Sequence, residues 1–229
     1  LVGANPVARS KETGDTLRYL RVYSNGPLYA PVTGFYSLVY GATGLERTEN
    51  RILTGKSDLL VVDRIDQLFA GEQPKGGAVS TTIDARAQKA AFDGLRGKRG
   101  SVVAIEPSTG RILASVQSPS FDPNLLSSHD PAAIRKYYAT LEADPSKPLL
   151  NRPIVALNPP GSTFKLVTTA AALASGRFTP DSVIPGPRTY QLPDSTHKIR
   201  NWSGQSCGPD DLVTLRQALA ISCNTAFAW

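Results

Sequence analysis

A serine and a lysine lie three residues apart in the segment 162–165 (STFK), directly after the turn-forming residues 158–161. The apolar run 166–174 predicts a helix that ends at Gly176. Residues three apart at the first turn of a helix share a face, so the amine would lie beside the hydroxyl. Serine needs a neighbouring base to act as a nucleophile, and a lysine serves when burial or a nearby cation removes its proton. Alone this S-x-x-K pattern is weak, because most such serines only cap helices.

A second candidate motif, S-x-N, is formed by Ser222 and Asn224. It follows the apolar stretch 212–221, in which Thr214 and Gln217 have the spacing of a capping box. A helix that ends there would project both side chains from a turn. A hydroxyl can relay the proton held by the lysine, and an amide can bond a substrate carbonyl. The alternative is an ordinary helix C-terminus with turn residues, but the presence of the 162–165 segment favours a shared site.

With these motifs the chain resembles the class B penicillin-binding proteins, the serine D,D-transpeptidases that cross-link peptidoglycan. Residues 151–165 are similar to the segment that carries the family's nucleophile, and residues 100–124 to the strand–turn–strand that opens its transpeptidase domain. Residues 41–55, with GATGLE and LTG, resemble the N-terminal pedestal. The segment 29–36 (YAPVTGFY) is most similar to actinobacterial members.

The resemblance implies a role for each residue of the two motifs. Ser162 would be the nucleophile and Lys165 its base, while Ser222 would pass a proton to the leaving amine. Asn224 would bond Lys165 and the acyl amide, so that Ser162, Ser222 and Asn224 also bind substrate. The implied substrates are peptidoglycan stem peptides, and β-lactam antibiotics would acylate Ser162. Neither a cofactor nor a metal is expected.

One family motif, K-[ST]-G, is absent from these 229 residues, which end at Trp229 soon after S-x-N. In relatives that strand supplies a second oxyanion donor, and loss of one such donor costs roughly 10²–10³ in rate in a protease. We therefore expect a fragment, or one piece of a nicked protein whose partner is the remainder of its own transpeptidase domain. Alone, the chain is expected to turn over poorly.

Two cysteines, Cys207 and Cys223, fit an exported protein in which a disulfide persists. A bridge would close a loop of about 15 residues, worth about 3 kcal/mol in the entropy model, and would pin the S-x-N turn. Two buried free thiols are the alternative. Two cysteines cannot form a zinc site unaided, and His129 and His197 have no ligand spacing, so no metal site is predicted.

The composition is that of a globular protein, with 41% hydrophobic and 19% charged residues. No apolar run approaches the roughly 18 residues that a membrane-spanning helix needs. By resemblance we expect an extracytoplasmic portion at the bacterial membrane, with a single N-terminal anchor outside this chain and membrane-bound cell-wall synthesis proteins as partners. The net charge of +6 suits an anionic envelope. The basic cluster 96–99 lacks interleaved aromatic residues, so nucleic-acid binding is not expected.

The predicted fold class is α/β (α+β), a partial transpeptidase domain of the penicillin-binding/serine β-lactamase type behind a β-rich pedestal. Residues 1–75 are assigned to the pedestal and 76–229 to the transpeptidase domain, with 71–77 as a linker. Strands are predicted at 16–23, 35–40, 78–83, 102–105 and 112–116, and helices at 63–70 and at 84–95, the latter capped by Asp84. The last two strands are apolar on both faces, which indicates a sheet covered on both sides.

Other functional classes remain open. A β-lactam hydrolase or a β-lactam-sensing domain shares the S-x-x-K core, and a non-catalytic scaffold would use the pedestal alone to bind division or elongation partners. The segment 55–57 (GKS) resembles the end of a phosphate-binding loop but has Asn50 where that motif needs glycine. The glycosylation sequon at Asn201 is interpreted as a chance match.

Overall fold

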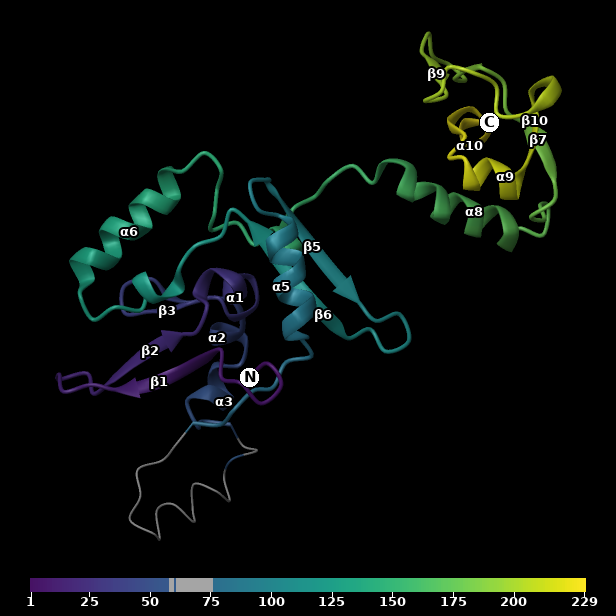
Figure 1. Ribbon diagram of the computed structural model, residues 1–229. Coiled ribbons are helices and arrows are strands. Elements are labelled where there is room, and N and C mark those ends of the chain that lie inside the picture. Colours follow the sequence, from purple (N-terminus) through teal and green to yellow (C-terminus); the bar gives the residue numbers. More distant parts are fainter. Residues whose placement is uncertain (58–59, 61–75) are drawn as a thin grey trace. The chain divides into compact units, whose positions relative to one another are not determined.

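The computed structural model describes residues 1–57, 60 and 76–229, which form two compact units, Leu1–Ala156 and Leu157–Trp229 (Figure 1). We call these the N-terminal and C-terminal units. The helix predicted at 63–70 and most of the linker at 71–77 lie outside the described residues. The predicted domain boundary at 75/76 also falls there and stays a prediction.

In its described residues, the N-terminal unit contains three two-stranded antiparallel ribbons and several short helices. The ribbons pair β1 (Ala8–Glu12) with β2 (Tyr19–Tyr23), β3 (Tyr36–Ser37) with β4 (Gly41–Ala42), and β5 (Gly100–Ile105) with β6 (Ile112–Ser118). The helices are α1 (Gly26–Thr33), α2 (Gly44–Thr48), α3 (Asn50–Leu53), α5 (Ala85–Gly94), α6 (Pro131–Ala143) and α7 (Arg152–Val155), with a 3₁₀ turn η2 (Pro123–Leu125).

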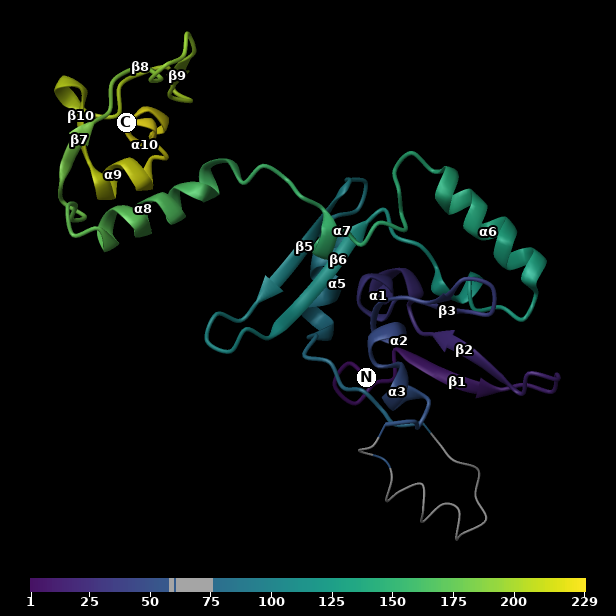
Figure 2. The ribbon, with the colours of Figure 1, turned by 180° about the vertical axis from the view of Figure 1, so that it is seen from behind.

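Helix α5 begins at the predicted cap. The Asp84 carboxylate accepts hydrogen bonds from the backbone N–H groups of Arg86 and Ala87, both at 2.9 Å, which satisfies two donors of the first turn. The helix lies on one face of the β5–β6 ribbon, as the two opposite views show (Figures 1 and 2). Its residue Gln88 is fully buried and links this ribbon to α1.

Among the residues that the structure describes, the core of the N-terminal unit has two clusters of buried side chains. One gathers Phe35, Phe121, Leu126 and Ile134, and the other gathers Val2, Val7, Tyr29 and Ile83. Both combine residues from before position 57 with residues from after position 76. Within the described residues, therefore, the predicted pedestal segment packs into the same clusters as Ile83 and the segment 121–141.

The C-terminal unit carries both candidate motifs. It begins with a 3₁₀ turn, η3 (Gly161–Phe164), that continues into α8 (Lys165–Ala174). Two antiparallel ribbons follow, β7 (Val183–Pro185) with β10 (Leu212–Thr214) and β8 (Thr189–Gln191) with β9 (Lys198–Arg200). The remaining elements are η4 (Pro209–Asp211), α9 (Leu215–Ala220) and α10 (Asn224–Ala228).

Several predicted strands differ from the structure. Residues 78–83 form no strand, because only Thr81 pairs, in an isolated bridge with Val2. The strand predicted at 35–40 is reduced to Tyr36–Ser37, and the one at 16–23 begins at Tyr19, since a turn occupies the residues before it. Alternating polarity marks these segments as extended but does not show where a partner strand is available.

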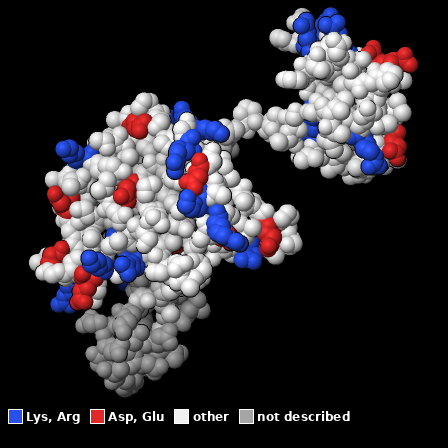
Figure 3. All heavy atoms as spheres, viewed as in Figure 1, with Lys and Arg blue, Asp and Glu red and all other residues white. Residues whose placement is uncertain are grey.

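The outer face of β5 is exposed, which differs from the prediction of a sheet covered on both sides. Val103 is 42% and Ile105 is 55% exposed, whereas Val116 of β6 is fully buried. Basic and acidic side chains stand interspersed on the face of each unit shown in Figure 3. The exposed side chains of Val103 and Ile105 make this part of the β5 surface apolar.

Candidate active site

Ser162 lies in the 3₁₀ turn η3, one turn before α8 begins at Lys165. The preceding Gly161 has φ +55°, a left-handed conformation that glycine adopts without steric cost. The Ser162 side chain is exposed. The predicted helix therefore starts at Lys165, and the serine occupies a tighter turn than an α-helix provides. The three-residue spacing still brings the Lys165 Nζ within 3.4 Å of the Ser162 Oγ.

The Lys165 amine is the centre of the site, because four oxygen atoms surround it. Its Nζ lies 2.9 Å from the Ser222 Oγ, 2.7 Å from the Ser222 carbonyl and 2.7 Å from the Asn224 Oδ1. The fourth is the Ser162 Oγ. The structure thus brings together the four residues that the sequence singled out, from segments 57 residues and more apart.

Ser222 lies in the turn between α9 and α10. Thr214 caps α9 by accepting from the Gln217 N–H at 3.2 Å, and the helix ends at Ala220. Ser222 then has φ +58°, which is uncommon for a residue with a side chain and costs of order 1–3 kcal/mol. This conformation presents both its hydroxyl and its carbonyl to Lys165. The S-x-N motif therefore contains a backbone acceptor as well as two side chains.

Asn224 is the first residue of α10 rather than part of the turn. Its Nδ2 donates to the Arg200 carbonyl at the end of β9, at 3.0 Å. Its Oδ1 accepts from Lys165 on the other side. The two contacts fix the orientation of the amide and leave one Nδ2 hydrogen for another partner.

Burial lowers the pKa of Lys165 below its ordinary value. No charged side chain contributes to this shift, since desolvation is its single cause. The Phe227 ring of α10 lies 5.7 Å from Nζ and covers one side of the amine. A lowered pKa raises the fraction of neutral lysine near pH 7, which is the form that accepts a proton from serine.

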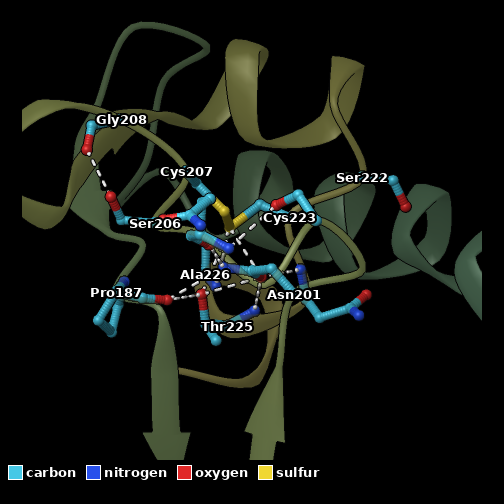
Figure 4. Close-up of a disulfide and its surroundings, with 12 residues drawn as sticks. Pro187, Asn201, Ser206, Cys207, Gly208, Ser222, Cys223, Thr225 and Ala226 are labelled. Atoms are coloured by element: carbon cyan, nitrogen blue, oxygen red, sulfur yellow. Dashed lines mark hydrogen bonds between the residues drawn. A yellow bond between two sulfur atoms is a disulfide. The ribbon is translucent and has the colours of Figure 1, made fainter.

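Cys207 and Cys223 are joined by a disulfide, so the middle residue of S-x-N is tied to the loop after β9 (Figure 4). Both cysteines belong to the hydrophobic core of this unit. A cavity of about 570 Å³ adjoins the bridge and is lined by Ser162, Trp202, Ser222 and Asn224, among others. The candidate nucleophile therefore opens onto a space large enough for a small ligand.

Sequence reasoning missed two residues of the surroundings, Asn201 and Phe227. Asn201 was noticed only as a sequon, yet it is buried and bonds the backbone at the start of α10. Phe227 has the i, i+3 spacing from Asn224 that places both on one face of α10, and this spacing was a usable signal for it. No comparable local signal marks Asn201, because its partners come from distant segments.

No group of three or more histidine, cysteine, aspartate or glutamate side chains among residues 1–57, 60 and 76–229 is arranged to hold a metal ion. Within the same residues, the helices are too short or too polar to span a bilayer.

Two family descriptions match the sequence. Residues 1–79 match the penicillin-binding protein A dimerisation domain, and residues 100–229 match the penicillin-binding protein transpeptidase domain. The second match covers more than half of the chain, and it includes Lys165 and the three residues whose oxygen atoms surround its amine. The chain belongs to the class B penicillin-binding protein family.

The relatives include peptidoglycan D,D-transpeptidase PbpA of Mycolicibacterium smegmatis, 51% identical over 98% of this chain and 47% of that protein. PbpA of Mycobacterium tuberculosis is 48% identical with the same coverage. Peptidoglycan D,D-transpeptidase MrdA of Escherichia coli is 35% identical over 82% of this chain and 30% of that protein. The predicted similarity to actinobacterial members is confirmed. The chain spans about half the length of the curated relatives it matches.

The fold is similar to those of solved penicillin-binding protein structures. Penicillin-binding protein A from M. tuberculosis, as a ceftriaxone acyl-enzyme complex, matches with a TM-score of 0.93 at 48% identity over 99% of this chain and 52% of that one. PBP2 of Pseudomonas aeruginosa matches with a TM-score of 0.76 at 32% identity over 96% and 48%. These matches confirm the predicted transpeptidase fold with its N-terminal pedestal.

Proposed function

We propose that this chain provides the nucleophile, base and S-x-N residues of a peptidoglycan D,D-transpeptidase. The observation that carries the proposal is the set of contacts from Lys165 to Ser162, Ser222 and Asn224, at 2.7–3.4 Å. The relatives' names and their β-lactam acyl-enzyme structures support the same reaction class.

In the first step the Ser162 Oγ attacks the carbonyl between the two terminal D-alanines of a stem peptide. Neutral Lys165 takes the hydroxyl proton as the new C–O bond forms, and the backbone N–H of Ser162 donates to the oxyanion. The C–N bond then breaks. The Ser222 hydroxyl, 2.9 Å from Nζ, relays the proton to the departing D-alanine amine, and an acyl-enzyme remains.

In the second step the amine of a neighbouring stem peptide attacks the acyl carbon. Lys165 accepts a proton from this amine through the Ser222 hydroxyl, and the C–O bond to Ser162 breaks. The proton passes to the Ser162 Oγ, which regenerates the hydroxyl and releases the cross-linked product. The second Nδ2 hydrogen of Asn224 bonds the acyl amide throughout. A β-lactam ring opens in the first step and leaves an adduct on Ser162.

Benzylpenicillin labelling of the full-length protein tests this proposal. Intact-mass spectrometry is expected to show one adduct, which peptide mapping places on Ser162. Ser162→Ala abolishes the adduct, whereas Ser175→Ala, near the other end of α8, keeps it. An adduct on another residue, or none on the full-length protein, contradicts the proposal.

The lifetime of the adduct separates the transpeptidase from a β-lactam hydrolase. A hydrolase releases the opened drug within its catalytic cycle, whereas a transpeptidase retains it because water is a poor substitute for the acceptor amine. We expect an adduct that persists after free drug is removed. The pedestal match at residues 1–79 is the observation that favours the transpeptidase over a hydrolase or sensing domain.

Ser162→Ala in cells separates the enzyme from a non-catalytic scaffold. An enzyme loses its cellular role with this change, and stem-peptide cross-linking falls. A scaffold that only binds division or elongation proteins keeps its role, because the substitution alters no surface beyond the site.

Location and partners form part of the same proposal. The disulfide supports an extracytoplasmic site at the bacterial membrane, with the N-terminal anchor and cell-wall synthesis partners that the family resemblance implies.

The apolar side chains of Phe164, Leu166 and Val167 are 54–63% exposed. We assign this surface to packing against the remainder of the transpeptidase domain. Hydrogen exchange should show it protected in the full-length protein.

A further inference from the structure

Asn201 connects three segments of the C-terminal unit beside the S-x-N turn (Figure 4). Its side chain is 8% exposed. The Nδ2 donates to the carbonyls of Pro187 and Gln205, at 3.0 and 2.9 Å. The Oδ1 accepts from the backbone N–H groups of Asn224 and Thr225, at 3.0 and 3.1 Å. Loss of a partner would leave buried polar groups unpaired, so these bonds hold the segments in register.

The segment that contains Asn201 makes two hydrogen bonds with Asn224. Asn201 fixes the Asn224 backbone through its N–H group, and the carbonyl of the preceding residue, Arg200, fixes the Asn224 side-chain amide. These two contacts leave the Asn224 Oδ1 directed at the Lys165 Nζ, 2.7 Å away. The position of this acceptor thus depends on a residue that is itself absent from both motifs.

We propose that Asn201 is a positioning residue for acylation, which holds Asn224 and the adjoining Ser222 against Lys165. This inference rests on the proposed function. Asn201 touches none of the reacting atoms and acts through Asn224. Its amide also satisfies the first two N–H groups of α10, so the start of that helix cannot shift without leaving a buried acceptor unpaired.

Loss of the hydrogen bonds from Asn201 to the start of α10 would have a chemical consequence at Lys165. Ser222 is in a left-handed conformation that neighbouring contacts must maintain. When the turn relaxes, water reaches the amine, and the burial that lowers the pKa of Lys165 is relieved. The groups that face Nζ are Ser162 from η3, Ser222 from the turn, and Asn224 and Phe227 from α10. All four are uncharged, so the pKa of Lys165 depends on how far water reaches its amine.

The test compares Asn201→Leu with Thr225→Val in the full-length protein. Thr225 is fully buried in the same cluster, and its hydroxyl lies 2.7 Å from the Pro187 carbonyl and 3.2 Å from the Asn201 Oδ1. Thr225→Val removes these contacts but leaves the bonds from Asn201 to the α10 backbone. It is therefore a control for loss of stability without loss of positioning.

The measurements are the acylation rate constant and the dissociation constant for benzylpenicillin as functions of pH, together with the melting temperature. We expect Asn201→Leu to lower the rate constant about 10- to 100-fold, with little change in the dissociation constant. The acidic limb of the pH–rate profile, over which the rate rises as Lys165 loses its proton, should move to higher pH. Thr225→Val should lower the melting temperature and leave the rate and the limb unchanged.

Equal rate losses in the two variants, or an unmoved acidic limb in Asn201→Leu, overturn the inference, because a purely structural loss scales the rate equally at every pH. If the parent protein is not acylated on Ser162, the proposed function itself fails and this inference fails with it.

Asn201→Asp provides the test if Asn201→Leu does not fold. It keeps an oxygen acceptor for the α10 backbone and loses the two Nδ2 donations. On the alkaline plateau, where an added carboxylate does not alter the fraction of neutral Lys165, we expect a rate constant within about threefold of Thr225→Val. A fall of tenfold or more there overturns the inference.

Discussion

At the scale of single residues, the chemistry depends on the protonation of Lys165. An amine serves as a base only when neutral, and burial lowers the pKa of this one. Acylation should therefore be slow in acid and rise with pH as the ammonium loses its proton. Relief of burial would move this rise to higher pH.

Lys165→Arg tests this dependence. A guanidinium does not deprotonate in proteins, so it retains the charge and removes the base. We expect acylation by benzylpenicillin to fall about 10²–10⁴-fold and to lose its acidic limb. Lys89→Arg, on the exposed side of α5, should match the parent. A Lys165→Arg protein with the parent's pH profile would mean that another group is the base.

At the scale of elements, the disulfide secures the turn between α9 and α10. It links residues 16 apart in the sequence, and a loop of this size corresponds to about 3 kcal/mol of unfolding free energy. Cys207→Ala should lower the unfolding free energy of the C-terminal unit by about that amount. Urea unfolding with and without reductant measures it. Reductant should destabilise the parent and leave the variant unchanged; an equal response in both would contradict the assignment.

The β1–β2 ribbon is secured by a pH-dependent contact. The His129 ring contacts the Asp15 carboxylate beyond the end of β1 and lies 3.0 Å from the Tyr19 carbonyl. The hydrogen bond that the His129 ring donates to the Asp15 carboxylate raises the pKa of His129, and the same bond lowers the pKa of Asp15. The contact therefore contributes its stability above the ordinary pKa of aspartate and below that of histidine. It is lost as pH rises through the folded pKa of His129, or falls through that of Asp15.

His129→Gln should lower the melting temperature most near pH 5.5. The difference from the parent should shrink as the pH rises through the folded pKa of His129, which lies above its ordinary value, and as it falls through the folded pKa of Asp15, which lies below its ordinary value. His197→Gln, at an exposed histidine of the other unit, is the control. A difference that does not vary with pH would show that the charges make no contribution.

At the scale of the whole molecule, Gln88 joins α1, from the predicted pedestal segment, to β6, from the predicted transpeptidase domain. Its Nε2 donates to the Leu28 carbonyl of α1 at 2.9 Å and to the Ser115 carbonyl of β6 at 3.0 Å. Its Oε1 accepts from the Ser115 N–H at 2.8 Å. Residues on both sides of the predicted domain boundary thus share hydrogen bonds as well as a hydrophobic core, and we expect them to unfold together.

Gln88→Leu should lower the unfolding free energy of the N-terminal unit by roughly 1–3 kcal/mol for each backbone group left unpaired. Hydrogen exchange against urea should show α1 and β6 losing protection at the same concentration. Arg86→Leu, on the exposed side of α5, should have little effect. Loss of protection in α1 while β6 stays protected would mean that the pedestal segment unfolds independently.

Features that depend on a few consecutive residues were determined by the sequence itself. The Ser162–Lys165 spacing, the Asp84 cap and the Thr214 cap are of this kind, because side chain and backbone within one turn find each other without the rest of the chain. The family followed from the motifs, since each is a run of a few consecutive residues.

Contacts between distant segments were decided only by the tertiary structure. The sequence did not show that the Ser222 carbonyl faces Lys165, that Arg200 orients the Asn224 amide, or that Asn201 holds the start of α10. It also predicted a strand at 78–83, of which only Thr81 pairs, with Val2. A hydrogen bond between segments depends on how both pack, and neither segment alone contains that information.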